Sequence, residues 1–246
     1  MPWATVWCGG PAACTPRLSP RTVDAPASYG GGVDVTGTRA DFLSLARSTG
    51  HLLRAPQVTT AWTRPSALPE LRVGDLAGHL AYQILVVPPA LAGPAATEPT
   101  VALLEHFARV RWIGAGIDDD ISVRIRRDAA EVGAEGPAAL SARVSAAVEQ
   151  LARDLPAAPD GPVHLPLWGG WSTTLDDMLV TRMVELAVHC DDLAVSVGVE
   201  TPTLAPGAVT AVLDVLTRLA VRRHGAVAVL RALSRAERAP ATIAAL

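Results

Sequence analysis

Aromatic residues make up only 4% of the 246 residues, although 50% of the chain is hydrophobic. Alanine, leucine and valine supply most of that apolar material, and charged residues make up 18%. A β-sandwich takes its core from β-branched and aromatic side chains, whereas closely packed helices tolerate small ones. The composition therefore favours an α-helical protein with one large or two small domains.

Cysteine is also scarce, since only Cys8, Cys14 and Cys190 occur and no CxxC pair is present. This count excludes a disulfide framework and is typical of a reducing cytoplasm. The longest apolar stretch, LAYQILVVPPALAG, is too short to span a membrane and is broken by Pro88 and Pro89. The N-terminus lacks the basic region and apolar core of a signal peptide. We therefore expect a cytoplasmic protein without a membrane partner.

The chain also lacks an excess of positive charge. The net charge is −3, and the densest basic run is RIRRD at residues 124–128. Three arginines on one helix are too few to follow a phosphate backbone, so this run is interpreted as a solvated helix face. The sequence therefore predicts no nucleic-acid partner.

Residues 1–36 are rich in Pro, Gly, Ala, Ser and Thr and show no periodicity, which predicts a disordered tail. Residues 37–240 are expected to form one helical domain. Helices are predicted at about 38–54, 73–87, 100–132, 137–154, 174–197 and 206–238. Thr38 is expected to cap the first of them, and Thr174 with Asp177 resembles a capping box before the fifth. The fold class is therefore a helix bundle.

The predicted helix at 174–197 is apolar nearly all round, so it should be buried. Arg182, Glu185, His189 and Asp192 nevertheless follow one another at steps of three, four and three, and they form one polar column. A buried carboxylate is costly unless it is paired or bound to a metal. Glu185 and His189 can hold one ion together, or they can form an ion pair.

The predicted helix at 73–87 repeats the pattern on one face. Its polar positions are Arg72, Asp75, His79 and either Tyr82 or Gln83. If the two stripes face each other, His79, Glu185 and His189 form a set of two histidines and one carboxylate. Three protein ligands leave a position open, as in catalytic zinc sites, and Fe(II) sites use the same set. The alternative is a hydrogen-bonded polar cluster in the core.

Two segments carry a resemblance to a known family: WTRPSALPELRVGDLAGHLAY and TLDDMLVTRMVELAVHCDDLAVSVG. They resemble the metal-binding N-terminal domain of mycothiol-dependent maleylpyruvate isomerase, in the DinB-like superfamily of four-helix metalloproteins. The resemblance covers about residues 38–235 and implies an all-α DinB-like four-helix bundle with extra short helices. It also implies a zinc ion on His79, Glu185 and His189, and mycothiol or a similar thiol as cosubstrate.

The isomerase has a second, mixed α/β domain after the bundle, whereas about 50 residues of helical pattern follow the metal-binding helix here. No catalytic residue of that domain can be carried over, so the catalytic residues stay unassigned. The expected function is S-transfer of a small thiol to an electrophilic molecule, or thiol-assisted isomerisation, because a metal-bound thiol deprotonates readily. The alternatives are a non-catalytic metal-binding or regulatory module and a metal-dependent hydrolase. The apolar last helix is compatible with a homodimer.

Four further residues are candidates for orienting the ligands or binding the thiol. Asp75 could orient His79 or act as a first-turn acid of its helix. Arg182 and Asp192 could contact the thiol or pair with each other. Trp168 could line the mouth of the site or pack against the end of the bundle.

Three remaining residues are interpreted as structural. Cys190 neighbours His189 but should point elsewhere, since adjacent helical residues diverge by about 100°. It is read as a small core residue. His106 and His224 lack the spacing of a metal-ligand pair and are interpreted as surface residues.

Overall fold

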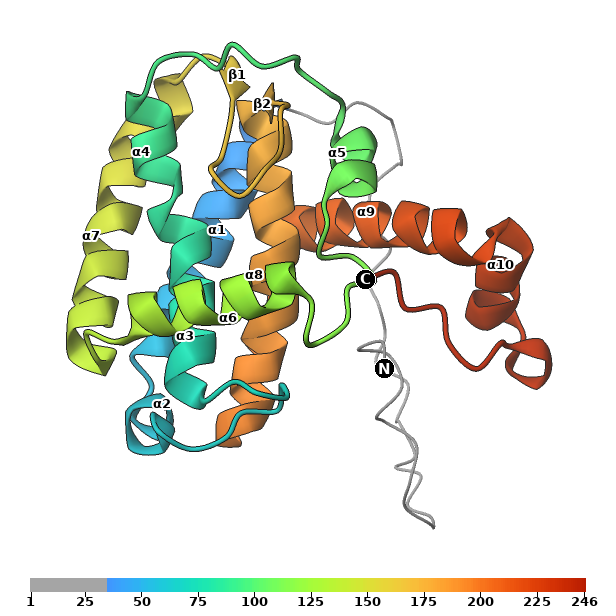
Figure 1. The fold of residues 1–246 in the computed structure, drawn as a ribbon, viewed down its shortest axis with the longest axis horizontal. Helices are drawn as coiled ribbons and strands as arrows, with labels where there is room; N and C mark the ends of the chain where they lie inside the picture. Colours follow the sequence, from blue (N-terminus) through green and yellow to red (C-terminus); the bar gives the residue numbers. More distant parts are fainter. Residues whose placement is uncertain (1–34) are drawn as a thin grey trace.

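The computed structural model describes residues 35–246 and confirms the all-α fold class (Figure 1). The predicted tail, residues 1–36, lies outside the described residues apart from its last two positions, which belong to the first helix. The α-helices are α1 Val35–Leu53, α2 Pro56–Ala61, α3 Val73–Leu85, α4 Val87–Ala92, α5 Leu103–Arg109, α6 Asp120–Gly133, α7 Pro137–Asp154, α8 Leu175–Val197, α9 Pro206–His224 and α10 Ala226–Ser234. Two short 3₁₀ helices are η1 Leu155–Ala157 and η2 Ala236–Arg238, and the strands β1 Pro162–Val163 and β2 Thr173–Thr174 pair antiparallel.

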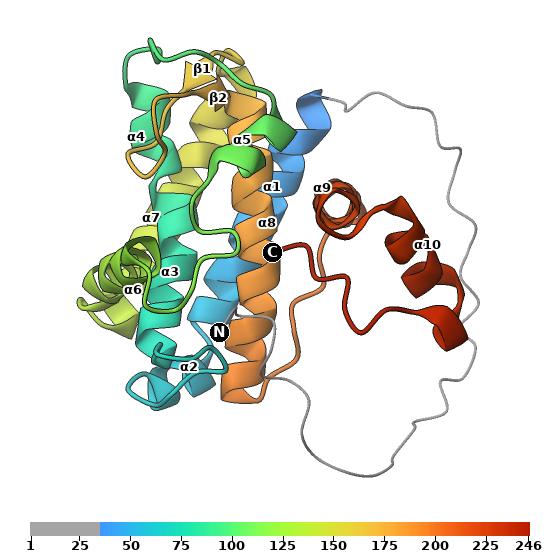
Figure 2. The ribbon, with the colours of Figure 1, turned by 45° about the vertical axis from the view of Figure 1, so that its right-hand side comes forward.

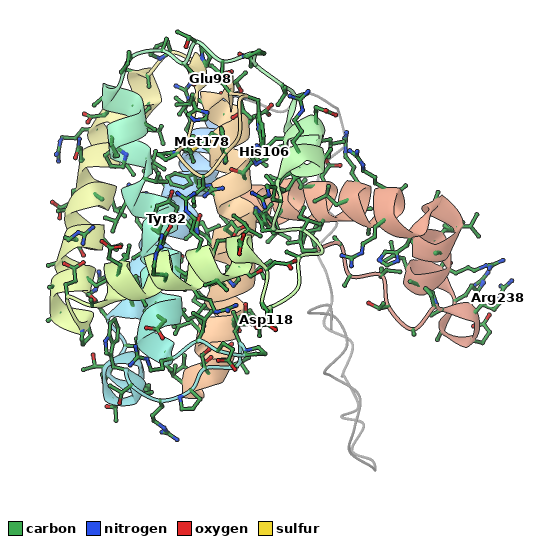
Figure 3. The ribbon with its side chains drawn as sticks, in the orientation of Figure 1. Tyr82, Glu98, His106, Asp118, Met178 and Arg238 are labelled. Atoms are coloured by element: carbon green, nitrogen blue, oxygen red, sulfur yellow. The ribbon has the colours of Figure 1, made fainter. Side chains whose placement is uncertain are left out.

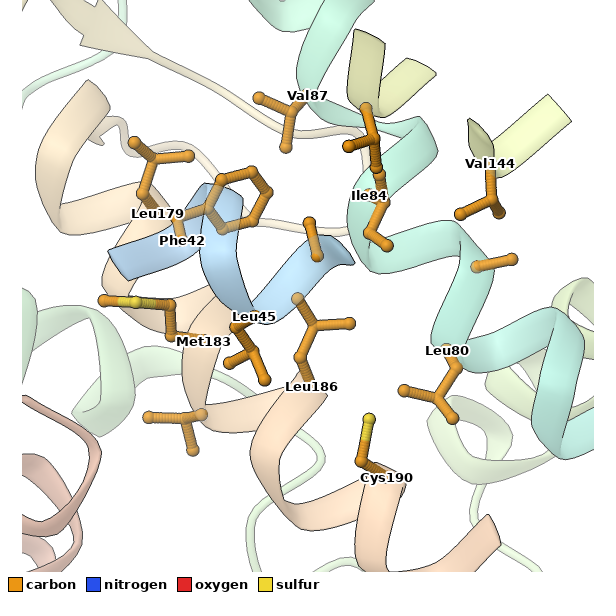
Figure 4. Packing of buried hydrophobic residues seen from close by; sticks show 14 of the residues in the cluster. Phe42, Leu45, Leu80, Ile84, Val87, Val144, Leu179, Met183, Leu186 and Cys190 are labelled. Atoms are coloured by element: carbon orange, nitrogen blue, oxygen red, sulfur yellow. The ribbon is translucent and has the colours of Figure 1, made fainter. Parts of the chain in front are cut away.

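Four of these helices, α1, α3, α7 and α8, run alongside one another as a bundle (Figures 1 and 2). Helix α8 packs against α1 and α3, and α7 packs against the same two helices. Their apolar faces meet in one continuous core, and Figure 4 shows Phe42 of α1, Ile84 of α3, Val144 of α7 and Leu186 of α8 within it. The core therefore lies directly behind the polar column of α8.

Helix α8 has both of the ends that its sequence predicts. The Thr174 hydroxyl accepts a hydrogen bond from the Asp177 amide at 3.2 Å, which satisfies one free N–H of the first turn. Gly198 follows the last turn with φ of 69°, a left-handed conformation that glycine adopts without steric cost. Between these ends the helix spans the full length of the bundle and positions Glu185 and His189 near its middle.

Two predicted helix boundaries are wrong. Residues 100–132 form two helices, α5 and α6, because the segment between them turns at Gly114, whose φ is 78°, and the Asp119 carboxylate accepts the Gly116 N–H at 2.6 Å. Helix α1 begins at Val35, so Thr38 lies inside its first turns and is buried rather than acting as the cap. The Pro88–Pro89 pair lies at the start of α4, where proline is tolerated.

Helix α6 crosses the outside of α3 at very close range (Figure 1). A Cβ atom on Gly78 would overlap the backbone oxygen of Ala129, and one on Gly133 would overlap the backbone oxygen of Gly74. Only glycine allows the two backbones to approach so closely. The crossing therefore fixes α3 at the turn that carries His79.

The chain leaves the bundle through α9, which runs crosswise to α8, and ends in α10 and a short tail (Figures 1 and 2). Several of the large exposed apolar side chains lie on these two helices: Leu213, Val221, Val227, Leu230 and Leu233. The homodimer stays a prediction. None of the helices within residues 35–246 is long and apolar enough to cross a membrane.

The helix crossing leads to a prediction about stability. We expect Gly78→Ala to lower the free energy of unfolding by about 3 kcal/mol, because the new methyl group must push the backbones apart. Gly50→Ala is the matched control, since its Cβ would meet only ordinary contacts at 3.6 and 3.7 Å. That variant should be unchanged or stabilised by up to about 1 kcal/mol. Urea unfolding of both variants measures the difference, and equal effects would contradict the close crossing.

Candidate metal centre

The two polar stripes face each other, and they bring His79 of α3 together with Glu185 and His189 of α8. One ligand atom from each residue lies within 4.8 Å of the others. His79 Nε2 is 3.3 Å and His189 Nε2 is 3.4 Å from the same oxygen, Glu185 Oε2. Ligands bound about 2.0–2.1 Å from a tetrahedral zinc ion lie about 3.3–3.4 Å apart. The donor types and their spacing therefore fit a tetrahedral divalent ion.

The three side chains are enclosed but remain in contact with solvent. Their exposed fractions are 17% for His79, 13% for Glu185 and 21% for His189. An ion can therefore enter, and a fourth ligand can approach from the solvent side. The three side chains are therefore mostly enclosed by the bundle without being sealed from solvent.

The charges of the three side chains depend on one another. Burial raises the pKa of Glu185, but hydrogen bonds with His189 and His79 outweigh burial and hold this pKa well below its usual value. Burial lowers the pKa of His79 despite the contact with Glu185. Burial also lowers the pKa of His189, but Asp192 and Glu185 more than compensate and raise it to about 9. The carboxylate is thus ionised, and both imidazoles point a nitrogen at it.

Asp192 contacts the His189 ring at the nitrogen opposite to the one that faces Glu185, whereas Gln83 contacts His79 at the same nitrogen that faces Glu185. Asp192 Oδ2 lies 2.8 Å from His189 Nδ1, so the other ring nitrogen, Nε2, faces Glu185. A carboxylate behind a histidine fixes its ring orientation and raises its basicity. Gln83 donates to the His79 backbone oxygen at 3.1 Å and places its amide nitrogen 3.3 Å from His79 Nε2. The sequence left Tyr82 and Gln83 as alternatives for this face.

Arg182 lies beside the cluster and has no carboxylate partner among the described residues. Its guanidinium donates to Gln83 Oε1 at 2.6 Å and to Thr181 Oγ1 at 3.1 Å, both of which are neutral. The Arg182 residue is only 8% exposed. The expected alternative of a pair between Arg182 and Asp192 is therefore not formed, since Asp192 contacts His189 instead.

Asp75 is not brought to His79. Both of its carboxylate oxygens accept hydrogen bonds from Arg72, whose backbone amide and side chain close the first turn of α3. The structure therefore agrees with the first-turn interpretation of Asp75. Cys190 is fully buried with its sulfur 3.2 Å from the Thr49 hydroxyl, and burial raises the pKa of its thiol to about 11.

The interpretation of His106 as a surface residue is wrong. This histidine lies at the junction of α5 and α8, and it is 1% exposed (Figure 3). Trp168 packs against its ring with centroids 4.5 Å apart, and Trp171 Nε1 donates to His106 Nδ1 at 3.1 Å. The sequence offered no periodic signal for this contact, because it joins α5 to a loop about 60 residues away.

Charged groups at the candidate metal centre also affect the pKa of His106. Burial is the main cause that lowers its pKa to about 4, and the positive charge of Arg182 lowers it further. The negative charge of Glu185 acts in the opposite direction. Trp168, a candidate for the mouth of the site, therefore packs against a histidine whose pKa is affected by the charges of Arg182 and Glu185.

A helix bundle that carries two histidines and one glutamate on facing helices defines the class, a DinB-like helical protein. The family model described as the mycothiol maleylpyruvate isomerase N-terminal domain matches residues 42–194. The chain therefore belongs to this family, as its two motif segments predicted, and the matched region includes all three candidate ligands. No curated protein and no solved structure gives a significant match to the chain.

The low pKa of His106 predicts a specific response to acid. In the unfolded chain this pKa returns to about 6.5, so the unfolded state binds more protons than the folded state between about pH 6.5 and 4. The stabilisation is complete above pH 6.5 and is lost as the pH falls toward 4. Between about pH 7 and 4, we expect the free energy of unfolding of His106→Gln to fall by about 3 kcal/mol less than that of the wild type.

Urea unfolding across this pH range measures the effect, with EDTA present so that metal release does not contribute. His51→Gln is the matched control, because it replaces an exposed histidine on α1 with the same residue. Equal pH dependence in the wild type and His106→Gln would show that His106 is not buried in its neutral form.

Proposed function

We propose that this chain is a metal-dependent enzyme that transfers a low-molecular-weight thiol to an electrophilic small molecule, or uses the thiol to isomerise it. Mycothiol is the thiol that the family name supports. His79, Glu185 and His189 would hold the ion, and zinc is the ion that their donor set and spacing favour. The proposal rests on one observation. Both imidazole nitrogens lie at nearly the same distance, 3.3 and 3.4 Å, from Glu185 Oε2, and the three side chains are partly exposed to solvent.

The charges around the site support an anionic ligand. With a divalent ion in place, two positive charges join that of Arg182, while Glu185 and Asp192 supply two negative charges. One positive charge then remains unbalanced in an enclosed setting, where an uncompensated charge is costly. A thiolate would neutralise it. A neutral ligand such as water would not.

Each side chain has a distinct task in this reaction. A divalent ion bound here would favour the thiolate over the thiol, and the thiolate is the reactive nucleophile. Asp192 keeps the His189 ring in place, and Gln83 accepts a hydrogen bond from Arg182 while its amide nitrogen lies beside the His79 ring. Arg182 contributes a fixed positive charge beside the thiolate. Both proposed reactions begin when the thiolate adds to an activated carbon.

Two other functions remain as alternatives. A metal-dependent hydrolase would use the same three ligands to activate water. A binding or regulatory module would keep the ion without any reaction, because a fold and a metal site do not by themselves determine function. The buried charge of Arg182, whose hydrogen bonds go to neutral partners, favours an anionic ligand and therefore a reaction over the non-catalytic module. The hydroxide of a hydrolase would meet the same charge, and the family name favours the thiol.

The metal site can be tested directly. We expect the purified protein to contain about one zinc ion per chain, and His189→Ala and Glu185→Gln to lose it, because each removes one of three ligands. Asp192→Asn should keep the site but weaken zinc binding by about 10–100-fold. Elemental mass spectrometry and competition with a chelator measure both effects. His51→Ala is the control, since it removes a histidine on α1 that is not a ligand, and a folded wild type without metal uptake would refute the site.

The reaction itself can be separated from the alternatives by varying the thiol. We expect the zinc-loaded protein to consume electrophiles faster in the presence of mycothiol, with loss of this acceleration in Glu185→Gln. Cys8→Ser and Cys14→Ser in all proteins remove two thiols that could react themselves. Consumption without added thiol would support the hydrolase, and zinc binding without any turnover would support the non-catalytic module.

A further inference from the structure

Helix α10 exposes a stripe of apolar side chains on one face. Val227, Leu230 and Leu233 follow one another at steps of three, and their exposed fractions are 58%, 65% and 71%. The helix packs chiefly against α9 and η2, and Val229 is its buried residue. The stripe therefore faces solvent rather than the neighbouring helix. A row of exposed apolar side chains, unlike a single one, indicates a surface that meets a partner.

Positive charge accompanies this stripe. Arg231 lies next to Leu230 and four positions after Val227, and Arg235 lies one turn further along. Both arginines are exposed, and neither forms an ion pair among residues 35–246. An arginine can lay its methylene groups on apolar material while its guanidinium reaches a negative charge. Helix α10 thus offers apolar contacts and unneutralised charge on the same surface.

The charge of the chain is divided unevenly along its length. Residues 215–246 contain six arginines and one acidic residue, whereas residues 1–214 contain 15 arginines and 23 acidic residues. The partner of this end of the chain should therefore be negatively charged. A second copy that met the stripe about a two-fold axis would place arginines against arginines. A nucleic acid would satisfy the arginines, but it would leave the leucines without an apolar partner.

The surface of an anionic lipid bilayer meets both requirements, and the position of α10 allows such a contact. In both views α10 lies at the end of α9 that is remote from the four-helix bundle (Figures 1 and 2). A flat surface can therefore approach α10 without meeting the bundle. The expectation of no membrane partner was drawn from the length of apolar segments, and a helix that lies within the headgroup region needs no spanning length.

We propose that α10 is a surface anchor that binds this chain reversibly to an anionic phospholipid bilayer. Val227, Leu230 and Leu233 enter the boundary between headgroups and acyl chains, and Arg231 and Arg235 contact lipid phosphates. The short apolar stripe makes the binding weak, and the arginines make it sensitive to salt. The inference does not depend on the proposed function, because none of its residues belongs to the candidate metal centre.

Binding is measured by cosedimentation of the full chain with phospholipid vesicles. Vesicles with about 40% phosphatidylglycerol should bind the chain at least about tenfold more tightly than pure phosphatidylcholine vesicles. The double variant Arg231→Gln, Arg235→Gln should weaken this binding about 25-fold, since each basic residue near an anionic surface contributes about fivefold. The matched control is Arg124→Gln, Arg127→Gln, which removes the same charge from α6, where both arginines pair with Asp128. The control should bind as the wild type does.

The apolar contribution has its own variant and control. Leu230→Ser with Leu233→Ser leaves the charge unchanged and should weaken binding by at least about tenfold. Val123→Ser, at a position on α6 that is 48% exposed, should have no effect. If only the arginine variant weakens binding, α10 is a general site for polyanions such as nucleic acids, and the proposal is overturned.

Two further outcomes would contradict the anchor. Equal binding to both kinds of vesicle, or no binding at low salt, would exclude recognition of anionic lipid. Sedimentation equilibrium without lipid examines the second copy as the occupant. A wild-type dimer that Leu230→Ser with Leu233→Ser separates into monomers would assign the stripe to a subunit interface and overturn the proposal, whereas a monomer in both cases supports it.

Discussion

The negative charge of Glu185 is the constraint on which the site depends. Helix α8 is apolar on nearly every side, and the carboxylate points into space that it shares with α3. Moving such a charge out of water costs several kcal/mol unless compensating groups are close. The two imidazoles 3.3 and 3.4 Å away supply that compensation, and one of them comes from another helix. The relative position of α3 and α8 is therefore decided by electrostatics as well as by packing.

The position of α3 has a second cause on its opposite side. Gly78 and Gly133 let α6 cross α3 with backbone against backbone, so α3 is held between α6 and α8. His79 directly follows one of these glycines. A small movement of α3 would lengthen the contact between His79 and Glu185, whereas the contact with His189 lies within α8. The crossing of α6 is thus part of the construction of the site, although α6 contributes none of the three candidate ligands.

Helical periodicity predicted that His79, Glu185 and His189 lie together, while their role as metal ligands stays a prediction. The steps of three and four from Arg182 to Asp192 place four polar groups on one side of a helix whose other sides are apolar, and only a buried helix has that composition. The same reasoning selected His79 on α3. What periodicity cannot supply is the choice of partners: Asp192 contacts His189, and Asp75 contacts Arg72. Both contacts join residues three positions apart on one helix, so the spacing allows them but does not select them over contacts with the facing helix.

His106 shows where sequence reasoning ends. Residues 100–132 read as one bent helix, and on a continuous helix His106 would have no reason to face α8. The chain instead turns through Gly114 and Gly116, and this break frees the seven residues of α5 to pack on α8. The tryptophans that enclose His106 lie on a loop between β1 and β2 that has no periodic pattern. Both features depend on tertiary contacts, so the spacing of residues along the sequence does not reveal them.

The neutral partners of Arg182 bear on how the whole site works. Asp192 lies on the same helix as Arg182 and could act as its counterion, but its carboxylate contacts His189 at 2.8 Å instead. Gln83 holds the guanidinium at 2.6 Å without cancelling its charge, which a glutamate at this position would do. No carboxylate of the described residues lies within hydrogen-bond distance of Arg182, so its positive charge stays available to a ligand. A thiolate held by the ion would find there a partner that the folded chain leaves free.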